Sequence, residues 1–294
     1  MTRRGWLLFA AMCVLWGVPY LLIKVAVDEL SPSVIVLTRT GVGALVLLPV
    51  AAARGYLRPL APLWRWLLLF SALEIAGPWL LLTDAERHLS SSLAGLLIAA
   101  VPLVSAVASQ VLGSDDQLDA TRVLGLAIGL AGVVVLLGLD IGGQVGAACE
   151  IGLVALGYGT APQIITRKFA HLPSLGVIAT SLAITAVFYA PIAAISWPSR
   201  VPSSKVMWSL VGLSLACTVA AFMLFFALIA EVGPNRASVI TFVNPAVALL
   251  LGVVLVGESF TLGIALGFPL ILLGCVVATR RARLPEPLPA VAEV

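Results

Sequence analysis

Charge is scarce in this sequence of 294 residues. Only 11% of the residues are charged, whereas a soluble globular domain carries roughly a quarter. Hydrophobic residues account for 61%, and the mean hydropathy is +1.12. So few charges cannot cover a water-soluble globule of this length, which excludes a soluble fold and indicates a protein that lies in a lipid bilayer.

Residue types that carry chemistry in many enzymes are also few. The chain has two histidines, and its four cysteines lie singly inside apolar stretches, without the paired spacing of a metal or redox site. HExxH and GxSxG motifs are absent. The segment GVVLVGES at 252–259 differs from a phosphate-binding loop by Glu258, which stands where that loop needs lysine. The pattern therefore predicts no enzyme, no cofactor and no metal.

Long apolar stretches recur along the whole chain. A helix that crosses a bilayer needs about 20 mostly apolar residues, because its backbone polar groups must be satisfied internally. Windows of that length predict an all-α membrane protein of ten helices. In the first half they cover residues 6–27, 33–52, 64–83, 89–112 and 121–139. In the second half they cover residues 144–167, 174–197, 207–230, 236–256 and 260–279.

The two ends of the chain need separate interpretation. Arg3 and Arg4 precede the first apolar stretch, as they would in a signal peptide, but the stretch is too long and contains Trp16 and Lys24. We therefore expect an uncleaved first helix. Residues 280–294 are rich in proline and are expected to form a disordered cytoplasmic tail.

Basic residues gather in alternate loops, which predicts the orientation of the chain. Cationic short loops resist translocation and stay in the cytoplasm. With a cytoplasmic N-terminus, twelve of the 17 basic residues fall on the inner side: Arg3, Arg4, Arg54, Arg58, Arg65, Arg122, Arg167, Lys168, Arg236, Arg280, Arg281 and Arg283. This distribution predicts a plasma membrane protein, in the inner membrane of a bacterium, with both termini cytoplasmic. The net charge of +3 is spread over loops and gives no nucleic-acid surface.

The two halves of the chain resemble each other. At an offset of 142 residues Trp16 aligns with Tyr158, and at an offset of 143 Pro102 aligns with Pro245. A duplicated unit of five helices must enter the membrane from opposite sides in its two copies, so the repeats are inverted. Inverted repeats are typical of secondary transporters, whose substrate site lies between the repeats. The repeats are predicted to cover residues 6–139 and 144–279.

Several segments resemble the EamA domain of the drug/metabolite transporter superfamily. They are LWGVPYLLIK at 15–24, Ser31 and Pro32 with Arg39 and Pro49, AERHLSSSLAGLLIAAVPL at 85–103, GPNRASVITFVNPAVALLLGVVLVGES at 233–259, and the glycine pattern from Gly267 to Gly274. The sequence SDD at 114–116 departs from the family's Gly-Glu and leaves Asp115 as the equivalent of Glu258. The resemblance covers nearly the whole chain and implies two EamA repeats that transport a small metabolite.

Ionisable groups inside the apolar helices are the sharper clue to a site. A charge at the bilayer centre costs at least ~2.5 kcal/mol, so it should face a cavity or a partner. Glu74 is placed deepest, and we expect it to bind substrate or a coupling proton; the alternative is an ion pair with Arg39. For Lys24, snorkelling to the interface and a functional role remain open. The candidate substrate or coupling residues are Glu74, Lys24, Arg39, Glu150, Trp16, Tyr20, Tyr158 and Asn244.

Prolines and glycines inside the spans bear on helix packing. Pro102 and Pro245 are predicted to kink equivalent helices beside a shared cavity, although a kink that serves packing alone is the alternative. Two GxxxG pairs permit close approach of helices, either within the bundle or in a homodimer. These pairs are Gly125 with Gly129 and Gly263 with Gly267.

Together these features predict a secondary carrier that exports an amino acid, amine or related small metabolite by alternating access, and a proton is a candidate coupling ion. The alternative is an integral-membrane enzyme that acts on a lipid or isoprenoid substrate. Such an enzyme would need clustered acidic metal ligands or a nucleophile at the membrane face. Asp115, Asp116 and Asp119 form the acidic cluster of this sequence, and Asp115 is already explained by the repeat.

Overall fold

The computed structural model describes residues 1–111, 120–140 and 144–278, and in these ranges every regular element is helical. The first half contains α1 (Arg3–Ala26), α2 (Pro32–Ala53), η1 (Arg58–Leu63), α3 (Trp64–Ser71), η2 (Ala72–Ala76), α4 (Gly77–Ala85), α5 (Ser91–Ile98), α6 (Val101–Val111) and α7 (Ala120–Asp140). The second half contains α8 (Val145–Ile164), η3 (Ile165–Phe169), α9 (Ser174–Ile195), α10 (Ser204–Val211), η4 (Gly212–Ala220), α11 (Ala221–Val232), α12 (Pro234–Ala237), α13 (Ile240–Leu251), η5 (Gly252–Val256) and α14 (Leu262–Ala278).

These elements combine into the ten predicted membrane spans. Seven helical stretches have the length and hydropathy of a membrane span: Arg3–Ala26, Pro32–Ala53, Arg58–Ala85, Ser91–Ala108, Ala120–Gly138, Ser174–Ile195 and Ser204–Val232. Ile240–Val256 and Leu262–Ala278 are shorter apolar helices. The remaining span is α8, with 20 residues. The predicted fold class of ten helices is therefore confirmed, whereas the predicted tail and Asp115 lie outside the described residues.

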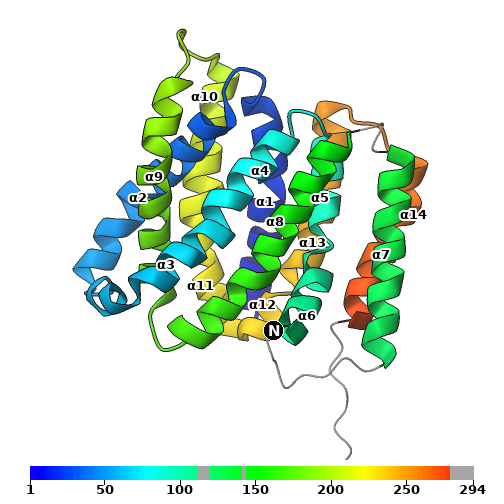
Figure 1. The fold of residues 1–294 in the computed structure, drawn as a ribbon, viewed down its shortest axis with the longest axis horizontal. Coiled ribbons are helices and arrows are strands. Elements are labelled where there is room, and N and C mark those ends of the chain that lie inside the picture. Colours follow the sequence, from blue (N-terminus) through cyan, green and yellow to red (C-terminus); the bar gives the residue numbers. More distant parts are fainter. Residues whose placement is uncertain (112–119, 141–143, 279–294) are drawn as a thin grey trace, which may run out of the picture.

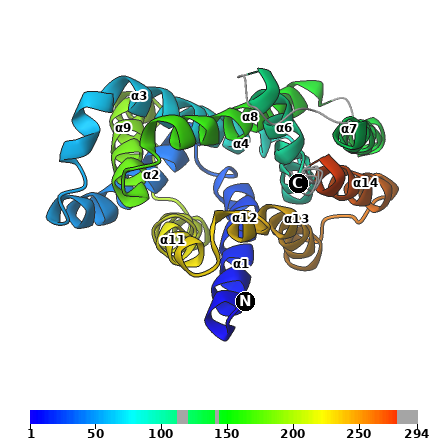
Figure 2. The ribbon, with the colours of Figure 1, turned by 90° about the horizontal axis from the view of Figure 1, so that it is seen from below.

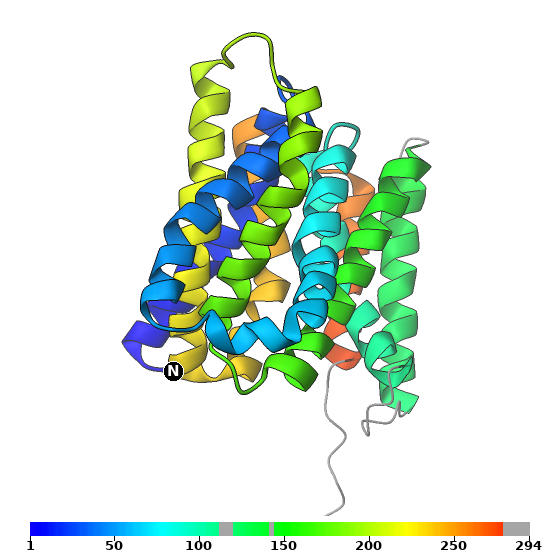
Figure 3. The same ribbon diagram turned by 60° about the vertical axis from the view of Figure 1, so that its left-hand side comes forward.

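Figure 1 shows the spans running between two ends of the bundle. We call the end where α1 begins and α14 ends the terminal end, and the opposite end the distal end. The connection between α2 and α3 lies at the terminal end, whereas the connection between α9 and α10 lies at the distal end (Figure 3). The buried apolar side chains form three clusters, which contain Leu96, Leu182 and Met12 respectively, each less than 2% exposed.

Contacts between helices follow the repeat. Helix α2 packs on α9 and α7 on α14, so each of these helices contacts its own equivalent in the other half, and α5 of the fourth span packs on α13 of the ninth. In the same way, α1 contacts α13 and α11, while α8 contacts α6 and α4. Exchanging the halves converts the contacts of α1 into those of α8. This pattern is the signature of two inverted five-helix repeats.

Helices α7 and α14 form a pair at the edge of the molecule (Figures 1 and 2). A Cβ atom on Gly125 would lie 2.3 Å from the backbone nitrogen of Ala278, and one on Gly274 would lie 2.3 Å from that of Gly129. Only glycine permits this approach, because a methyl group would overlap the facing backbone. Packing within the bundle is therefore confirmed for Gly125 and Gly129, whose close faces are not available to a second copy.

The two prolines expected to kink equivalent helices have different surroundings. Pro102 follows a break, since α5 ends at Ile98 and α6 begins at Val101. Pro245 lies inside α13, which continues from Ile240 to Leu251. The helices nevertheless lie together, because α5 contacts α13.

The described residues contain four π-helical segments, and two of them, in the third and eighth spans, lie at matching places. The turn η2 interrupts the third span, and η4 interrupts the eighth. At an offset of 142, Ala72 at the start of η2 aligns with Ser214 inside η4. Such wider turns are rare and often occur at functional sites. Here they place Glu74 on one span and Thr218 on the other in the middle of the bundle.

Candidate functional site

Arg39 lies between the two repeats. It is on α2, about 10 Å along the helix from Pro32 at 1.5 Å per residue, and it is 8% exposed. Its Nε donates a hydrogen bond of 2.8 Å to the Thr218 hydroxyl of η4. Its guanidinium carbon lies 3.7 Å from the ring centroid of Trp79 on α4. No carboxylate of the described residues lies within 4.0 Å of this cation, since the ion pairs found there are Arg4 with Glu231 and Arg87 with Asp84.

Aromatic side chains from both halves surround this cation. Tyr20 is 7% exposed, and both Tyr20 and Tyr158 interact electrostatically with Arg39. Tyr158 also lies within hydrogen-bonding reach of the Trp79 side chain. Of the residues predicted from sequence, Tyr20, Arg39 and Tyr158 are therefore brought together.

Trp16 occupies the corresponding position in the other half. Its ring contacts Phe222 with centroids 5.9 Å apart and Phe225 with centroids 4.7 Å apart. Trp16 aligns with Tyr158, and Trp79 aligns with Phe222 at an offset of 143. The contact of Trp16 with Phe222 is thus the repeat equivalent of the contact between Tyr158 and Trp79.

Glu74 lies in η2, half-buried, and interacts electrostatically with Tyr158. The alternative ion pair of Glu74 with Arg39 does not form, because Arg39 instead contacts Thr218 and Trp79. Tyr158 consequently has the carboxyl group of Glu74 and the guanidinium of Arg39 in its electrostatic surroundings. A carboxyl group and a guanidinium therefore approach the same phenol from two spans.

Lys24 connects α1 with the turn that joins α4 to α5. Its ammonium donates hydrogen bonds to the backbone oxygen of Glu86 at 2.7 Å and to that of Leu89 at 2.9 Å. These carbonyls follow the last turn of α4 and have no further helical partner. In this conformation Lys24 therefore joins α1 to the turn between α4 and α5 at the distal end.

Two other predicted residues lie apart from Arg39. The side-chain amide nitrogen of Asn244 donates hydrogen bonds to the backbone oxygens of Cys13 at 3.3 Å and Ile240 at 3.0 Å. The bond to Cys13 connects α13 to α1 beside Pro245. Glu150 has Asp84 and His88 as its charged neighbours, near the end of α4. One of its oxygens, Oε2, is buried without a hydrogen-bond partner.

Glu86 was not predicted as a site residue, because the sequence places it in a polar connection between helices. The structure buries it completely: its exposed fraction is 0%, and neither carboxylate oxygen has a hydrogen-bond partner. Lys24, Arg39 and Glu258 are its charged neighbours. A signal was available, since the predicted spans place Lys24 and Glu86 at the same end of neighbouring helices.

Glu258 caps the first turn of α5. Its carboxylate accepts hydrogen bonds from the backbone N–H groups of Ser91 at 2.7 Å and Ser92 at 2.9 Å. The Ser91 hydroxyl also donates, at 2.8 Å, as does the Ser92 hydroxyl. Burial raises the pKa of Glu258, but the hydrogen bonds from Ser92 and Ser91 outweigh it and hold the pKa below its ordinary value. The carboxylate thus fastens the loop after η5 to the distal end of α5.

Two further contacts join helices at the distal end. Glu29, in the connection after α1, accepts a hydrogen bond of 2.7 Å from the backbone N–H of Ser203 before α10. Ser33 on α2 lies 2.9 Å from the hydroxyl of Ser196 after α9. Together with Lys24 and Glu258, these contacts join helices at the distal end, where a smaller cavity of about 220 Å³ lies beside Glu258.

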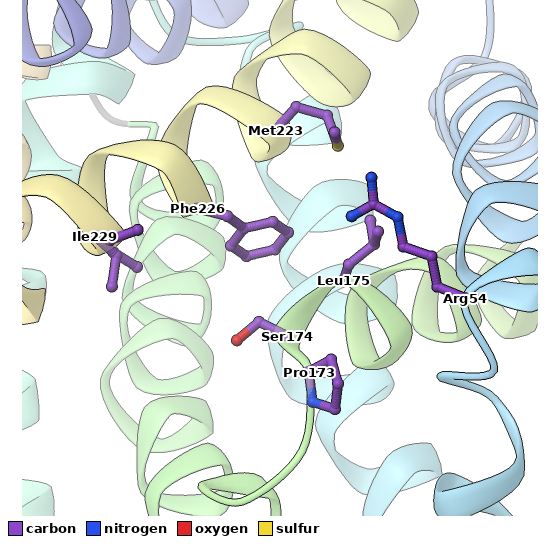
Figure 4. A pocket seen from close by; sticks show the side chains of 8 residues that line it. Arg54, Pro173, Ser174, Leu175, Met223, Phe226 and Ile229 are labelled. Atoms are coloured by element: carbon purple, nitrogen blue, oxygen red, sulfur yellow. The ribbon is translucent and has the colours of Figure 1, made fainter. Parts of the chain in front are cut away.

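A cavity of about 410 Å³ lies at the terminal end (Figure 4). It is lined by Arg54, Pro173, Ser174, Leu175, Met223, Phe226, Ile229 and Ala230. The Phe226 ring stacks on Phe222 at 6.2 Å, and Phe222 contacts Trp16. An aromatic wall therefore leads from this cavity towards the middle of the bundle.

Ten membrane-spanning helices in inverted halves, with a buried cation and aromatic side chains between the halves, define a polytopic membrane protein with the architecture of a secondary transporter. The chain belongs to the EamA-like transporter family, whose model matches residues 3–138 and 147–280, and thereby to the drug/metabolite transporter superfamily.

Several relatives match along almost their whole length. The uncharacterized inner membrane transporter YedA of Escherichia coli K12 is 27% identical and aligned over 97% of this chain and 93% of its own. The uncharacterized transporter YvbV of Bacillus subtilis strain 168 is 26% identical over 95% of this chain and 92% of its own. A solved crystal structure with 25% identity superimposes with a TM-score of 0.66, covering 95% of this chain and 97% of the other.

Proposed function

We propose that this membrane transporter is a secondary carrier that moves an amino acid, or a related metabolite with a carboxylate, through the Arg39 site by alternating access. The observation that carries the proposal is a buried guanidinium with an aromatic and a hydroxyl contact but no carboxylate within 4.0 Å among the described residues. A buried charge is costly until an opposite charge and hydrogen bonds compensate it. The carboxylate of a solute supplies both, in the paired geometry that guanidinium groups favour.

The surroundings of Tyr158 support an amino acid over a simple carboxylic acid. Glu74 and Arg39 both interact with this phenol. An amino acid carries a carboxylate and an ammonium group, which match Arg39 and Glu74 respectively. Aromatic faces near the site add attraction for a cationic group.

The charge distribution and the cavity support a location and a direction for transport. The distribution of basic residues favours a cytoplasmic terminal end, and the relative YedA carries the description inner membrane transporter. The cavity lies at the terminal end, while hydrogen bonds join the helices at the distal end. A cytoplasmic solute therefore has the shorter way to the site in this conformation, which supports export from a bacterial inner membrane.

The proposal is tested with the full chain in proteoliposomes that contain radiolabelled amino acids and amines, under imposed pH gradients. We expect efflux of one class of solute. Arg39→Gln should lower that flux about tenfold or more, because a charge-assisted hydrogen bond is worth about 1.5–3 kcal/mol. Arg65→Gln is the matched control, since Arg65 also lies over an aromatic ring, that of Trp64, but at the beginning of α3.

Two results would contradict the proposal. Absence of flux for every solute, together with chemical conversion of a purified lipid, would favour the membrane enzyme. Equal flux in wild type and Arg39→Gln would show that Arg39 does not bind the transported solute, even if the protein is a carrier.

A further inference from the structure

Glu86 is a buried acid that the Arg39 site does not use. It follows the last residue of α4, its exposed fraction is 0%, and both of its carboxylate oxygens lack a hydrogen-bond partner. Ionised carboxylates are strong acceptors and are costly to bury without donors. A carboxyl group in this place gains more from binding a proton than a carboxyl group in water does.

Four titratable groups face Glu86 from the surrounding elements. They are Lys24 and Tyr20 from α1, Arg39 from α2, and Glu258 from the loop after η5. Neither cation lies within 4.0 Å of the carboxylate. The Lys24 ammonium is bound to two backbone oxygens, one of them that of Glu86, and the Arg39 guanidinium is bound to Thr218.

The charges around Glu86 act in opposite directions. Burial raises its pKa well above the ordinary value, Lys24 and Arg39 lower it, and Glu258 raises it further. Glu258 itself keeps its charge because the backbone and hydroxyl donors of Ser91 and Ser92 hold it. Burial and Glu258 therefore both favour the protonated form of Glu86.

We propose that Glu86 is a proton-binding site, occupied while the distal end is closed and emptied to water when that end opens. The proton adds to one carboxylate oxygen and later leaves to water, so no other reactant takes part. The same contacts that bury Glu86 also close the distal end: Lys24 on the turn after α4, and Glu258 on the first turn of α5. Opening separates these contacts, hydrates Glu86 and restores its ordinary acidity. The role of this proton in coupling rests on the proposed function, whereas its binding does not.

Proton binding is tested without any solute. The full chain in liposomes is titrated between about pH 5 and pH 9, on both sides of the ordinary carboxyl range, while infrared difference spectra record the C=O band of protonated carboxyl groups. At neutral pH we expect a band in wild type that is reduced in Glu86→Gln. Asp84→Asn, at an acid two residues earlier whose side chain is 36% exposed, should retain it. Identical spectra in wild type and Glu86→Gln would overturn the proposal.

Glu86→Asp provides a second variant if Glu86→Gln does not fold. It keeps a carboxyl group but changes its length, so the band should move rather than disappear. A band that stays unchanged in Glu86→Asp would overturn the assignment to this residue.

A separate measurement tests whether opening of the distal end controls proton binding at Glu86. Glu258→Gln removes the charge that Ser91 and Ser92 hold and should open this end more often. The Glu86 band should then disappear at a lower pH than in wild type, by about one pH unit or more. An unchanged titration in Glu258→Gln would overturn the link to opening.

Failure of the transport proposal gives a different result from failure of this one. If no solute crosses the membrane but the Glu86 band behaves as described, the proton site stands and the carrier proposal falls. If solute crosses with the same pH dependence in wild type and Glu86→Gln, the coupling role of the proton is overturned.

Discussion

The guanidinium carbon of Arg39 lies 3.7 Å from the ring centroid of Trp79, and this contact has no counterpart in the other half. The repeat carries Trp79 onto Phe222, another aromatic residue, but carries Arg39 onto Ser181. Ser181 is completely buried, and its hydroxyl lacks a hydrogen-bond partner. The aromatic frame around Arg39 is thus duplicated, whereas its cation is not.

Trp79→Leu should weaken solute binding at Arg39. A desolvated cation–π contact is worth about 2 kcal/mol, so the KM for the transported solute should rise roughly tenfold or more. Trp64→Leu, which removes the ring beneath Arg65 at the beginning of α3, is the control and should leave KM unchanged. An unchanged KM in Trp79→Leu would show that this contact serves packing only.

Glu74→Gln should abolish flux or uncouple it from pH, while expression and thermal stability stay near the wild-type values. The reason is that Glu74 has no ion pair among the described residues, so its carboxyl group is available to an ammonium group or a proton. Flux is measured in proteoliposomes at several pH values. Full pH-dependent transport by this variant would refute a functional role for Glu74.

Glu258→Gln should lower the free energy of unfolding by about 1–3 kcal/mol at neutral pH, because hydrogen bonds to a charged acceptor weaken. The depressed pKa of Glu258 means that its contribution is present above the ordinary glutamate pKa and is lost as the pH falls through the depressed value. Wild type and variant should therefore converge in acid. Thermal unfolding in detergent at a series of pH values measures this, and a constant difference would contradict it.

Glu29→Gln serves as a comparison for the same measurement. Glu29 is exposed, and the hydrogen bonds from Ser203 lower its pKa. Solvent screens a contact at such a position, so its loss should shift the melting temperature less than the loss of the Glu258 contact does.

Gly125→Ala should destabilise the fold by separating α7 from α14. The added methyl group would lie 2.3 Å from a backbone nitrogen, which the neighbour cannot avoid by changing a rotamer, and overpacking of this kind costs about 1–3 kcal/mol. Gly138→Ala on the same helix is the control, since a methyl group added there would have no atom within 4 Å. Equal melting temperatures of the two variants would contradict the close packing.

Reporter fusions should place both termini in the cytoplasm. A fusion after Gly143 is expected to behave as external and one after Arg283 as cytoplasmic, because basic residues gather on the side of the termini. The opposite result at either position would contradict the cytoplasmic orientation of the terminal end, on which the proposed direction of transport depends.

Hydropathy and internal similarity were sufficient to predict the fold. Each span needs a long apolar stretch, and this requirement leaves little freedom in counting helices. The π-helical turns were not predictable, because they depend on tertiary packing rather than on a distinct residue pattern. Helix boundaries moved by a few residues: the α-helix of the third span begins at Trp64 as predicted, but η1 precedes it from Arg58 and the span continues to Ala85.

The candidate site was predicted only in part. Arg39, Tyr20 and Tyr158 were identified because charge and aromatic character stand out in apolar helices. Glu86 was missed because burial of a loop residue depends on how other spans cover it, which local composition does not reveal. Lys24 was identified, but its bonds to backbone oxygens of the α4–α5 turn depend on the position of that turn in space.

The glycine seam between α7 and α14 has a mechanical consequence. Where backbone faces backbone at this distance, there is no layer of side chains whose rotamers can adjust, so the two helices resist sliding past each other. One helix of the pair comes from each repeat. The pair therefore forms a rigid connection between the halves at the edge of the molecule. We expect the larger displacements of a transport cycle to occur among the remaining eight spans.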